Sequence, residues 1–404
     1  MRKQLSASIV PLFIWLCCIP LAAFRIKVLL AQLPLNDFIS YWAAGHLFLT
    51  GFNPYSPDAL LALERAHGWP FPPFVMLCPP WTLPLAALLG AVPMHAARVV
   101  WLVISIALNA FSAAGLWMYF GGGKRRLWIA LLVALTFLPM GSAEHLGQIT
   151  PLVLASITGF LLLQRSRWDF LAGAVLLGFG FKPHLLYLVW IALLLWVVQT
   201  RRWKIIAGAG ASYVLALSVA LLYNNQALHY FGNSYGAAIN TVCGMGGALR
   251  IVFGMQHVWL QYLVPAIGLL WFIGYWRRNG QAWSWRDHLP LLLVVSLASS
   301  PYCWAHDFIL ILPALISLAV RQAWRSILVL ISYIAVQFLL ACVWWSVLAG
   351  VLNSLWILFY WFSDSKIPAA GAETPTSTGS SEKAYSLAII EGYDPALVRG
   401  ALKW

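Results

Sequence analysis

The chain is organised around one short stretch, LPLNDFISYWAAG at residues 33–45, which follows the first hydrophobic segment. It places a carboxylate, Asp37, where the chain is expected to leave a membrane. The run that begins at Phe38 is apolar and aromatic. Asp37 is therefore either the N-cap of a helix, because Asp is a preferred capping residue, or a functional side chain, because an ionisable group among apolar residues at a membrane boundary is costly.

The composition indicates an integral membrane protein. Of the 404 residues, 62% are hydrophobic and 9% are charged, which leaves too little polar surface for a water-soluble globule. We predict an all-α, polytopic helical bundle with about 11–13 hydrophobic segments. The first segment, residues 6–30, is predicted to be a retained span and not a cleaved signal peptide, because Arg25 and Lys27 interrupt it.

The chain is predicted to form one membrane domain, residues 1–362, with two large outer loops. The first loop, 32–70, carries short amphipathic helices, including one near 57–67. The segment 71–93 contains five prolines and is expected to be broken or re-entrant. The second loop is 224–256. From residue 363 to 404 the composition turns to Ser, Thr, Gly, Pro and Glu, which predicts a largely disordered tail.

The net charge of +13 is best explained by membrane topology and not by nucleic-acid binding. Lys and Arg gather in alternate short loops, which are predicted to be cytoplasmic by the positive-inside rule. Asp169 and Asp287 adjoin these basic loops and are expected to balance their charge. Asp58 and Glu64 are expected to cap or solvate a helix of the first outer loop. The remaining polar turns then face outward together.

Several outward side chains are candidates for binding a phosphate or a sugar. Lys182 either extends its side chain to the membrane interface, as lysines near helix ends do, or binds a phosphate at head-group level together with His184. Arg250, in a glycine-rich stretch, is a further phosphate candidate. His306 is a candidate for orienting a substrate, whereas Asp307 in the first turn of its helix fits a helix-dipole role.

A third polar cluster consists of Glu144, His145 and Gln148. No tight ligand spacing indicates a metal site, and we predict neither a metal nor another cofactor. The predicted substrate-binding side chains, taken together, are Tyr41, Trp42, Tyr55, Glu144, His145, Gln148 and Asp307.

An ordered series of short motifs resembles glycosyltransferase family 87. The motifs are NDFISYWAAG (36–45), GFNPY (51–55), PPF (72–74), GQ (147–148), GAVLLGFGFKPH (173–184) and WAHD (304–307). The family consists of polytopic enzymes of the GT-C class and includes polyprenol-phosphate-mannose-dependent mannosyltransferases. The resemblance covers roughly residues 8–320, with the motifs in the same order.

This resemblance implies a GT-C-type bundle and a polyprenyl-phosphate sugar donor, with mannose as the model hexose. It implies a lipid or glycan acceptor, an outer-face active site in the plasma (inner) membrane, and inversion at the anomeric carbon. Asp37 matches the acidic general base of the family's first outer loop, and Lys182 and His306 match positions near the donor phosphate. Two alternatives remain at this stage: a flippase of lipid-linked sugars and a non-catalytic assembly subunit.

Overall fold

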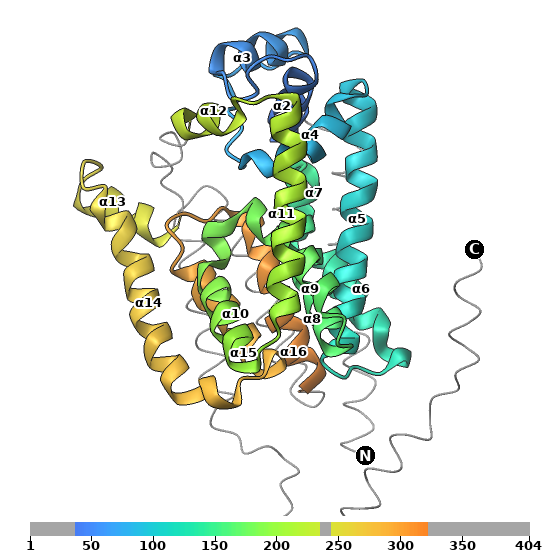
Figure 1. The fold of residues 1–404 in the computed structure, drawn as a ribbon, viewed down its shortest axis with the longest axis vertical. Helices are drawn as coiled ribbons and strands as arrows, with labels where there is room; N and C mark the ends of the chain where they lie inside the picture. The colour runs from blue at the N-terminus through green and yellow to red at the C-terminus, as the bar shows by residue number, and fades with distance from the viewer. Residues whose placement is uncertain (1–36, 235–243, 322–404) are drawn as a thin grey trace, which may run out of the picture. The chain divides into compact units, whose positions relative to one another are not determined.

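The computed structural model describes residues 37–234 and 244–321 (Figure 1). All the regular elements within these ranges are helices, which confirms the predicted all-α bundle. The predicted first span and the predicted tail from residue 363 lie outside the described residues.

Four helices in the described ranges are long and apolar enough to cross a membrane. They are α5 (Met94–Tyr119), η4 with α10 (Pro183–Leu186 and Tyr187–Thr200), α11 (Trp203–Tyr223) and α14 with η6 (Trp259–Asn279 and Gly280–Ala282). A fifth candidate is a pair bent by 56°, in which the short η2 (Lys124–Arg126) and α6 (Leu127–Thr136) are followed by α7 (Leu138–Leu146). Pro139 opens the second half of that pair, and a proline ring in this place accounts for the break.

The other predicted segments fold as shorter or interrupted helices. They are α8 (Thr150–Arg165), α9 with η3 (Asp169–Ala174 and Val175–Phe181), α15 (Trp285–Ala298) and η7 with α16 (Ala305–Ile311 and Leu312–Arg321). The segment predicted as the second outer loop contains α12 (Ala227–Ser234) and α13 (Met245–Phe253).

The segment predicted as the first outer loop forms the short helices α2 (Phe38–Leu49) and α3 (Pro57–Ala66). Residues 68–79 contain no helix, and η1 (Pro80–Thr82) leads into α4 (Leu83–Gly90). The helical part of the proline-rich segment is therefore far shorter than the roughly 20 residues that a helix needs to cross a bilayer.

Close glycine contacts fix α2 against α4, which Figure 1 shows beside each other. A Cβ added at Gly45 would lie 1.9 Å from the carbonyl oxygen of Ala86, and one at Gly90 would lie 2.2 Å from the backbone nitrogen of His46. Backbone contact of this kind is possible only between glycines or other very small residues. It fixes the helix that begins directly after Asp37.

A second glycine pair joins α9 to α11. A Cβ at Gly173 would lie 2.0 Å from the carbonyl oxygen of Ile205, and one at Gly208 would lie 1.9 Å from that of Phe170. Helix α9 continues through η3 to Lys182, so this contact supports the segment that carries the lysine.

We expect Gly208→Ala to destabilise the protein and Gly210→Ala to leave its stability unchanged or slightly raised. The methyl group at Gly208 meets backbone that cannot move aside, which costs about 1–3 kcal/mol or more. Gly210 lies on the same helix with nothing within 4 Å of an added Cβ, and Ala is the better helix former. Thermal unfolding midpoints in detergent measure the difference. Equal midpoints for the two variants would contradict the packing described for α9 and α11.

The acidic residues beside the basic loops balance charge, as predicted. Arg202 Nε donates to Asp169 Oδ2 at 3.0 Å, and Arg321 Nη2 lies 2.9 Å from Asp287 Oδ1. Glu64 differs from its expected solvated role. It is fully buried, and its Oε2 accepts a hydrogen bond from the backbone N–H of Phe74 at 3.0 Å. The irregular proline-rich segment gives that N–H no helical partner, so a side chain takes its place.

Candidate active site

The side chain of Asp37 does not cap α2. The residue occupies the N-cap position, but its φ and ψ of −60° and −24° are already helical, and the carboxylate makes no capping hydrogen bond. Instead, Oδ2 accepts a hydrogen bond from Gln148 Nε2. The carboxylate is thus turned toward a segment more than a hundred residues away in the sequence.

Gln148 joins three segments through one amide side chain. While its Nε2 donates to Asp37, its Oε1 accepts from Tyr41 Oη at 3.2 Å and from Lys182 Nζ at 2.9 Å. Gln148 is 4% exposed, so these bonds replace the water contacts that burial removes. One side chain therefore links the carboxylate at the start of α2 to the lysine between η3 and η4.

Lys182 extends the network to the start of η7. Its Nζ lies 2.6 Å from Asp307 Oδ1 and 3.4 Å from His306 Nε2. Asp307 Oδ1 also accepts from Thr150 Oγ1 at 3.1 Å, and Oδ2 accepts from the backbone N–H of Trp304 at 3.0 Å. Asp307 therefore caps the first turn of its helix by a hydrogen bond and in addition pairs with the lysine.

Local backbone features place these side chains. Gly147 ends α7 in the left-handed region, at φ 72° and ψ 33°, where glycine is unstrained. A Cβ at this position would lie 2.6 Å from Cβ of Phe38, so the absence of a side chain lets Gln148 approach Asp37. Lys182 precedes Pro183, which keeps the lysine backbone out of the helical region, at φ −136° and ψ 66°.

Burial shifts the pKa of the Asp37 carboxyl group. It raises the pKa of Asp37 from 3.8 to about 6, although the Gln148 hydrogen bond and the charge of Lys182 pull the pKa down in part, and the charge of Asp307 raises it further. A carboxylate with a pKa near neutral is largely ionised at pH 7 and still basic enough to take a proton.

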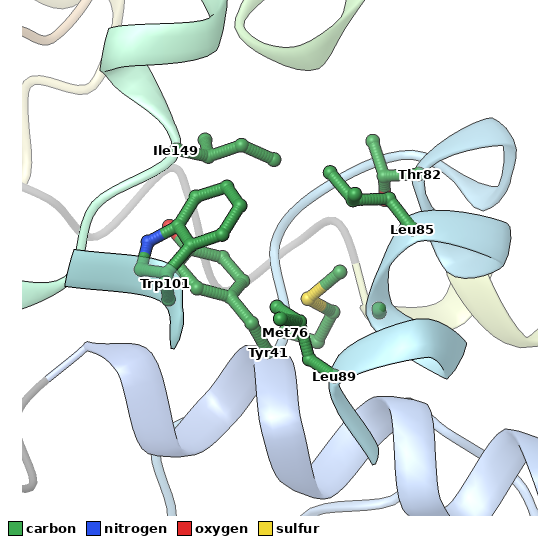
Figure 2. A pocket seen from close by; sticks show the side chains of 8 residues that line it. Tyr41, Met76, Thr82, Leu85, Leu89, Trp101 and Ile149 are labelled. Carbon is green, nitrogen blue, oxygen red and sulfur yellow. The ribbon is translucent and has the colours of Figure 1, made fainter. Parts of the chain in front are cut away.

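An apolar pocket adjoins the network (Figure 2). Tyr41 belongs to both, because its hydroxyl reaches Gln148 while its ring lines the pocket. Figure 2 shows Trp101 and Ile149 on one side of the pocket and Thr82 and Leu85 on the other. Its remaining lining residues are Met76, Ala86 and Leu89.

Some predicted site residues make their main contacts elsewhere. Trp42 Nε1 donates to the carbonyl of Val92 at 2.9 Å, and Tyr55 Oη donates to the carbonyl of Cys78 at 3.0 Å. The carboxylate of Glu144 accepts from Asn109 Nδ2 at 2.7 Å. These three hydrogen bonds are made to residues other than Asp37, Gln148, Lys182, His306 and Asp307.

The other predicted phosphate candidates are also placed differently from Lys182. His184 stacks on Tyr302 with ring centroids 3.9 Å apart. Arg250 is buried, and its Nη1 donates to Gln261 Oε1 at 2.6 Å. His145 contributes its backbone carbonyl, which accepts from Arg98 Nη2 at 2.7 Å.

Two residues near the network were not predicted. Thr150 gives no sequence signal, because its bond to Asp307 depends on tertiary contact. Arg98 does give a sequence signal, because an arginine inside an apolar span indicates a functional residue. Within the described ranges, no three His, Cys, Asp or Glu side chains are grouped to hold a metal ion.

Helices long and apolar enough to cross a membrane, together with a buried network of carboxylates, lysine, histidine and amide, indicate a multi-pass membrane protein with a polar site. The sequence model of glycosyltransferase family 87 matches residues 77–301, more than half of the chain. The chain belongs to glycosyltransferase family 87 and is a membrane glycosyltransferase. No curated protein and no solved structure matches it. Gln148 and Lys182 lie inside the matched range, whereas Asp37, His306 and Asp307 lie outside it.

Proposed function

We propose that the enzyme transfers a mannose-like hexose from a polyprenyl-phosphate donor to a hydroxyl of a lipid or glycan acceptor at the outer face of the plasma membrane. One observation carries the proposal: Asp37 and Lys182 bind the same side chain, Gln148. The proposed proton acceptor, Asp37, and the proposed phosphate-binding cation, Lys182, are thereby held at opposite ends of the Gln148 side-chain amide.

Asp37 is the proposed general base. The acceptor oxygen forms a bond to the anomeric carbon as the bond from that carbon to the phosphate oxygen breaks. The electron pair of the broken bond leaves with the polyprenyl phosphate, and the acceptor proton passes to the Asp37 carboxylate. Attack opposite the leaving group inverts the anomeric carbon. A phosphate leaves without being protonated, so this site needs no second catalytic carboxylate, unlike a glycosidase.

Lys182 is the proposed cation for the donor phosphate, which gains negative charge as it leaves. Its three ammonium hydrogens face Gln148, Asp307 and His306, and the contact with His306 is the longest at 3.4 Å. A phosphate oxygen would replace this weakest contact at the smallest cost. His306 would then lie beside the phosphate and Asp307 would keep the lysine in place.

The direct test uses the purified full-length protein in liposomes with two donors that carry the same labelled hexose, one linked to polyprenyl phosphate and one to a nucleotide. We expect a new glycosidic bond and released polyprenyl phosphate only with the lipid donor. The Asp37→Asn variant supplies the background rate. Transfer from the nucleotide donor alone would contradict the proposed donor, and movement of the lipid across the bilayer without bond formation would indicate a flippase.

The rate should depend on pH through Asp37. Because the base must be ionised and its pKa is about 6, we expect kcat/KM to rise as pH increases through about 6 and to level off above about pH 7. Single-turnover rates between about pH 5 and 8 measure this limb. Donor binding measured over the same range is the control, and a rate that does not change across it would contradict the assignment of Asp37.

A further inference from the structure

Arg98 is a buried cation without a carboxylate partner in the described part of the chain. It lies in α5 and is 2% exposed. Its Nη2 donates to the backbone carbonyls of Glu144 at 2.9 Å and His145 at 2.7 Å. Its Nε and Nη1 have no hydrogen-bond partner among residues 37–234 and 244–321. Burial of such a charge is expensive, so its position calls for an explanation.

The guanidinium touches both sides of the bond between Asp37 and Gln148. Its Cζ lies 5.4 Å from the ring centroid of Phe38, the residue after Asp37. The same atom would be 3.3 Å from a Cβ on Gly147, the residue before Gln148. A cation over an aromatic face is attracted to it, so Arg98 holds the start of α2 against the turn after α7.

Arg98 also fixes the end of α7. The last carbonyls of a helix lack intrahelical partners and carry the negative end of its dipole, and Arg98 binds those of Glu144 and His145. One turn further along α5, Trp101 Nε1 donates to the carbonyl of Gly147 at 2.9 Å. Helix α5 thus fixes the turn from which Gln148 extends.

We infer that Arg98 is a positioning residue for sugar transfer, because it holds the two backbone segments whose side chains form the bond between Asp37 and Gln148. The inference rests on the proposed function, in which Asp37 is the base. Arg98 itself touches neither the transferred proton nor the phosphate. Its effect on the reaction passes through Gln148.

This role predicts a change in the pH profile as well as in the rate. The Gln148 hydrogen bond lowers the pKa of Asp37, so a looser bond lets that pKa rise. The acid limb of kcat/KM then moves to higher pH. The charged and titratable groups around Asp37 in the described residues are Tyr41 of α2, Cys78 of the proline-rich segment, Arg98 of α5, His145 of α7, Lys182 before η4, and His306 and Asp307 of η7.

The test compares Arg98→Met with Arg286→Met in the full-length protein in liposomes. Arg286 Nη2 also donates to a helix-terminal carbonyl, that of Phe120 at 2.7 Å, but at the other end of α5. We expect Arg98→Met to lower kcat/KM at pH 7 by roughly 10- to 100-fold and to move the midpoint of the acid limb upward by about 0.5–1 pH unit. Arg286→Met should change neither, and Arg98→Lys should recover part of the loss.

A double variant shows whether Arg98 acts through Gln148. We expect Arg98→Met to add no further shift of the midpoint in a Gln148→Leu background, because coupled residues are not additive. A full additional shift there, or a slower Arg98→Met enzyme with the wild-type midpoint, would overturn the inference. If Arg98→Met does not accumulate, Arg98→Gln, which keeps the donors to the carbonyls, is compared in the same two backgrounds. Activity of Asp37→Asn would instead overturn the proposed function.

Discussion

Replacing Asp37 by asparagine is expected to lower kcat/KM for sugar transfer by about 100- to 10,000-fold. The amide has nearly the same shape as the carboxylate and can still accept the hydrogen bond from Gln148 Nε2, but it cannot take a proton from the acceptor. Formation of the glycosidic bond in reconstituted membranes measures the loss.

The same substitution should not destabilise the protein, which separates catalysis from folding. The folded-state pKa of Asp37, about 6, lies above the ordinary value of 3.8. Below about pH 4 Asp37 is protonated in both the folded and the unfolded protein, so its ionisation costs no stability. As pH rises from about 4 through 6, ionisation favours the unfolded protein and lowers the free energy of unfolding by up to about 3 kcal/mol relative to a variant with a neutral side chain. At pH 7 we expect the Asp37→Asn thermal midpoint to equal or exceed that of the wild type.

The matched control is Asp58→Asn, which removes an exposed carboxylate from the first turn of α3, the helix that follows α2. It should keep wild-type transfer. Turnover by Asp37→Asn at the wild-type rate, or equal losses in the two variants, would show that Asp37 is not the base.

The sequence predicted the features that depend on local chemistry. The low charge content and the long apolar stretches predicted a helical membrane bundle. The prolines of 71–93 predicted the break before α4, because a proline removes a helical hydrogen bond wherever it falls. The acidic partners of Arg202 and Arg321 were also predictable, since they lie beside the basic loops.

The site itself was predictable only in part. Asp37, Lys182 and Asp307 stood out as rare charges, but the role of Asp37 depended on a backbone angle and a partner that sequence spacing does not reveal. Gln148 was recognised as polar and not as the residue that joins the segments. The burial of Glu64 depends on its hydrogen bond from the backbone N–H of Phe74, which has no helical partner. The sequence does not reveal that contact, because it depends on how the irregular segment folds back on α3.

The ion pair between Lys182 and Asp307 supports both folding and the proposed chemistry, and paired variants should separate the two. Lys182→Met leaves the carboxylate of Asp307 buried, at 1% exposure, without its cation. Removing one partner of a buried pair typically costs about 3–5 kcal/mol. The hydrogen bonds from Thr150 and Trp304 to the carboxylate remain and place the expected loss at the lower end of that range. Thermal midpoints in detergent measure it.

Adding Asp307→Asn to Lys182→Met removes the stranded charge and keeps an acceptor for Thr150, so most of the stability should return. Activity should not return, because the donor phosphate still lacks its cation, and we expect kcat/KM to stay about 100-fold or more below the wild type. Arg321→Met is the matched control. It breaks a pair whose side chains are 39% and 57% exposed and should cost less than about 1 kcal/mol. A double variant that regains both stability and transfer would show that Lys182 serves the fold alone and that the phosphate is bound elsewhere.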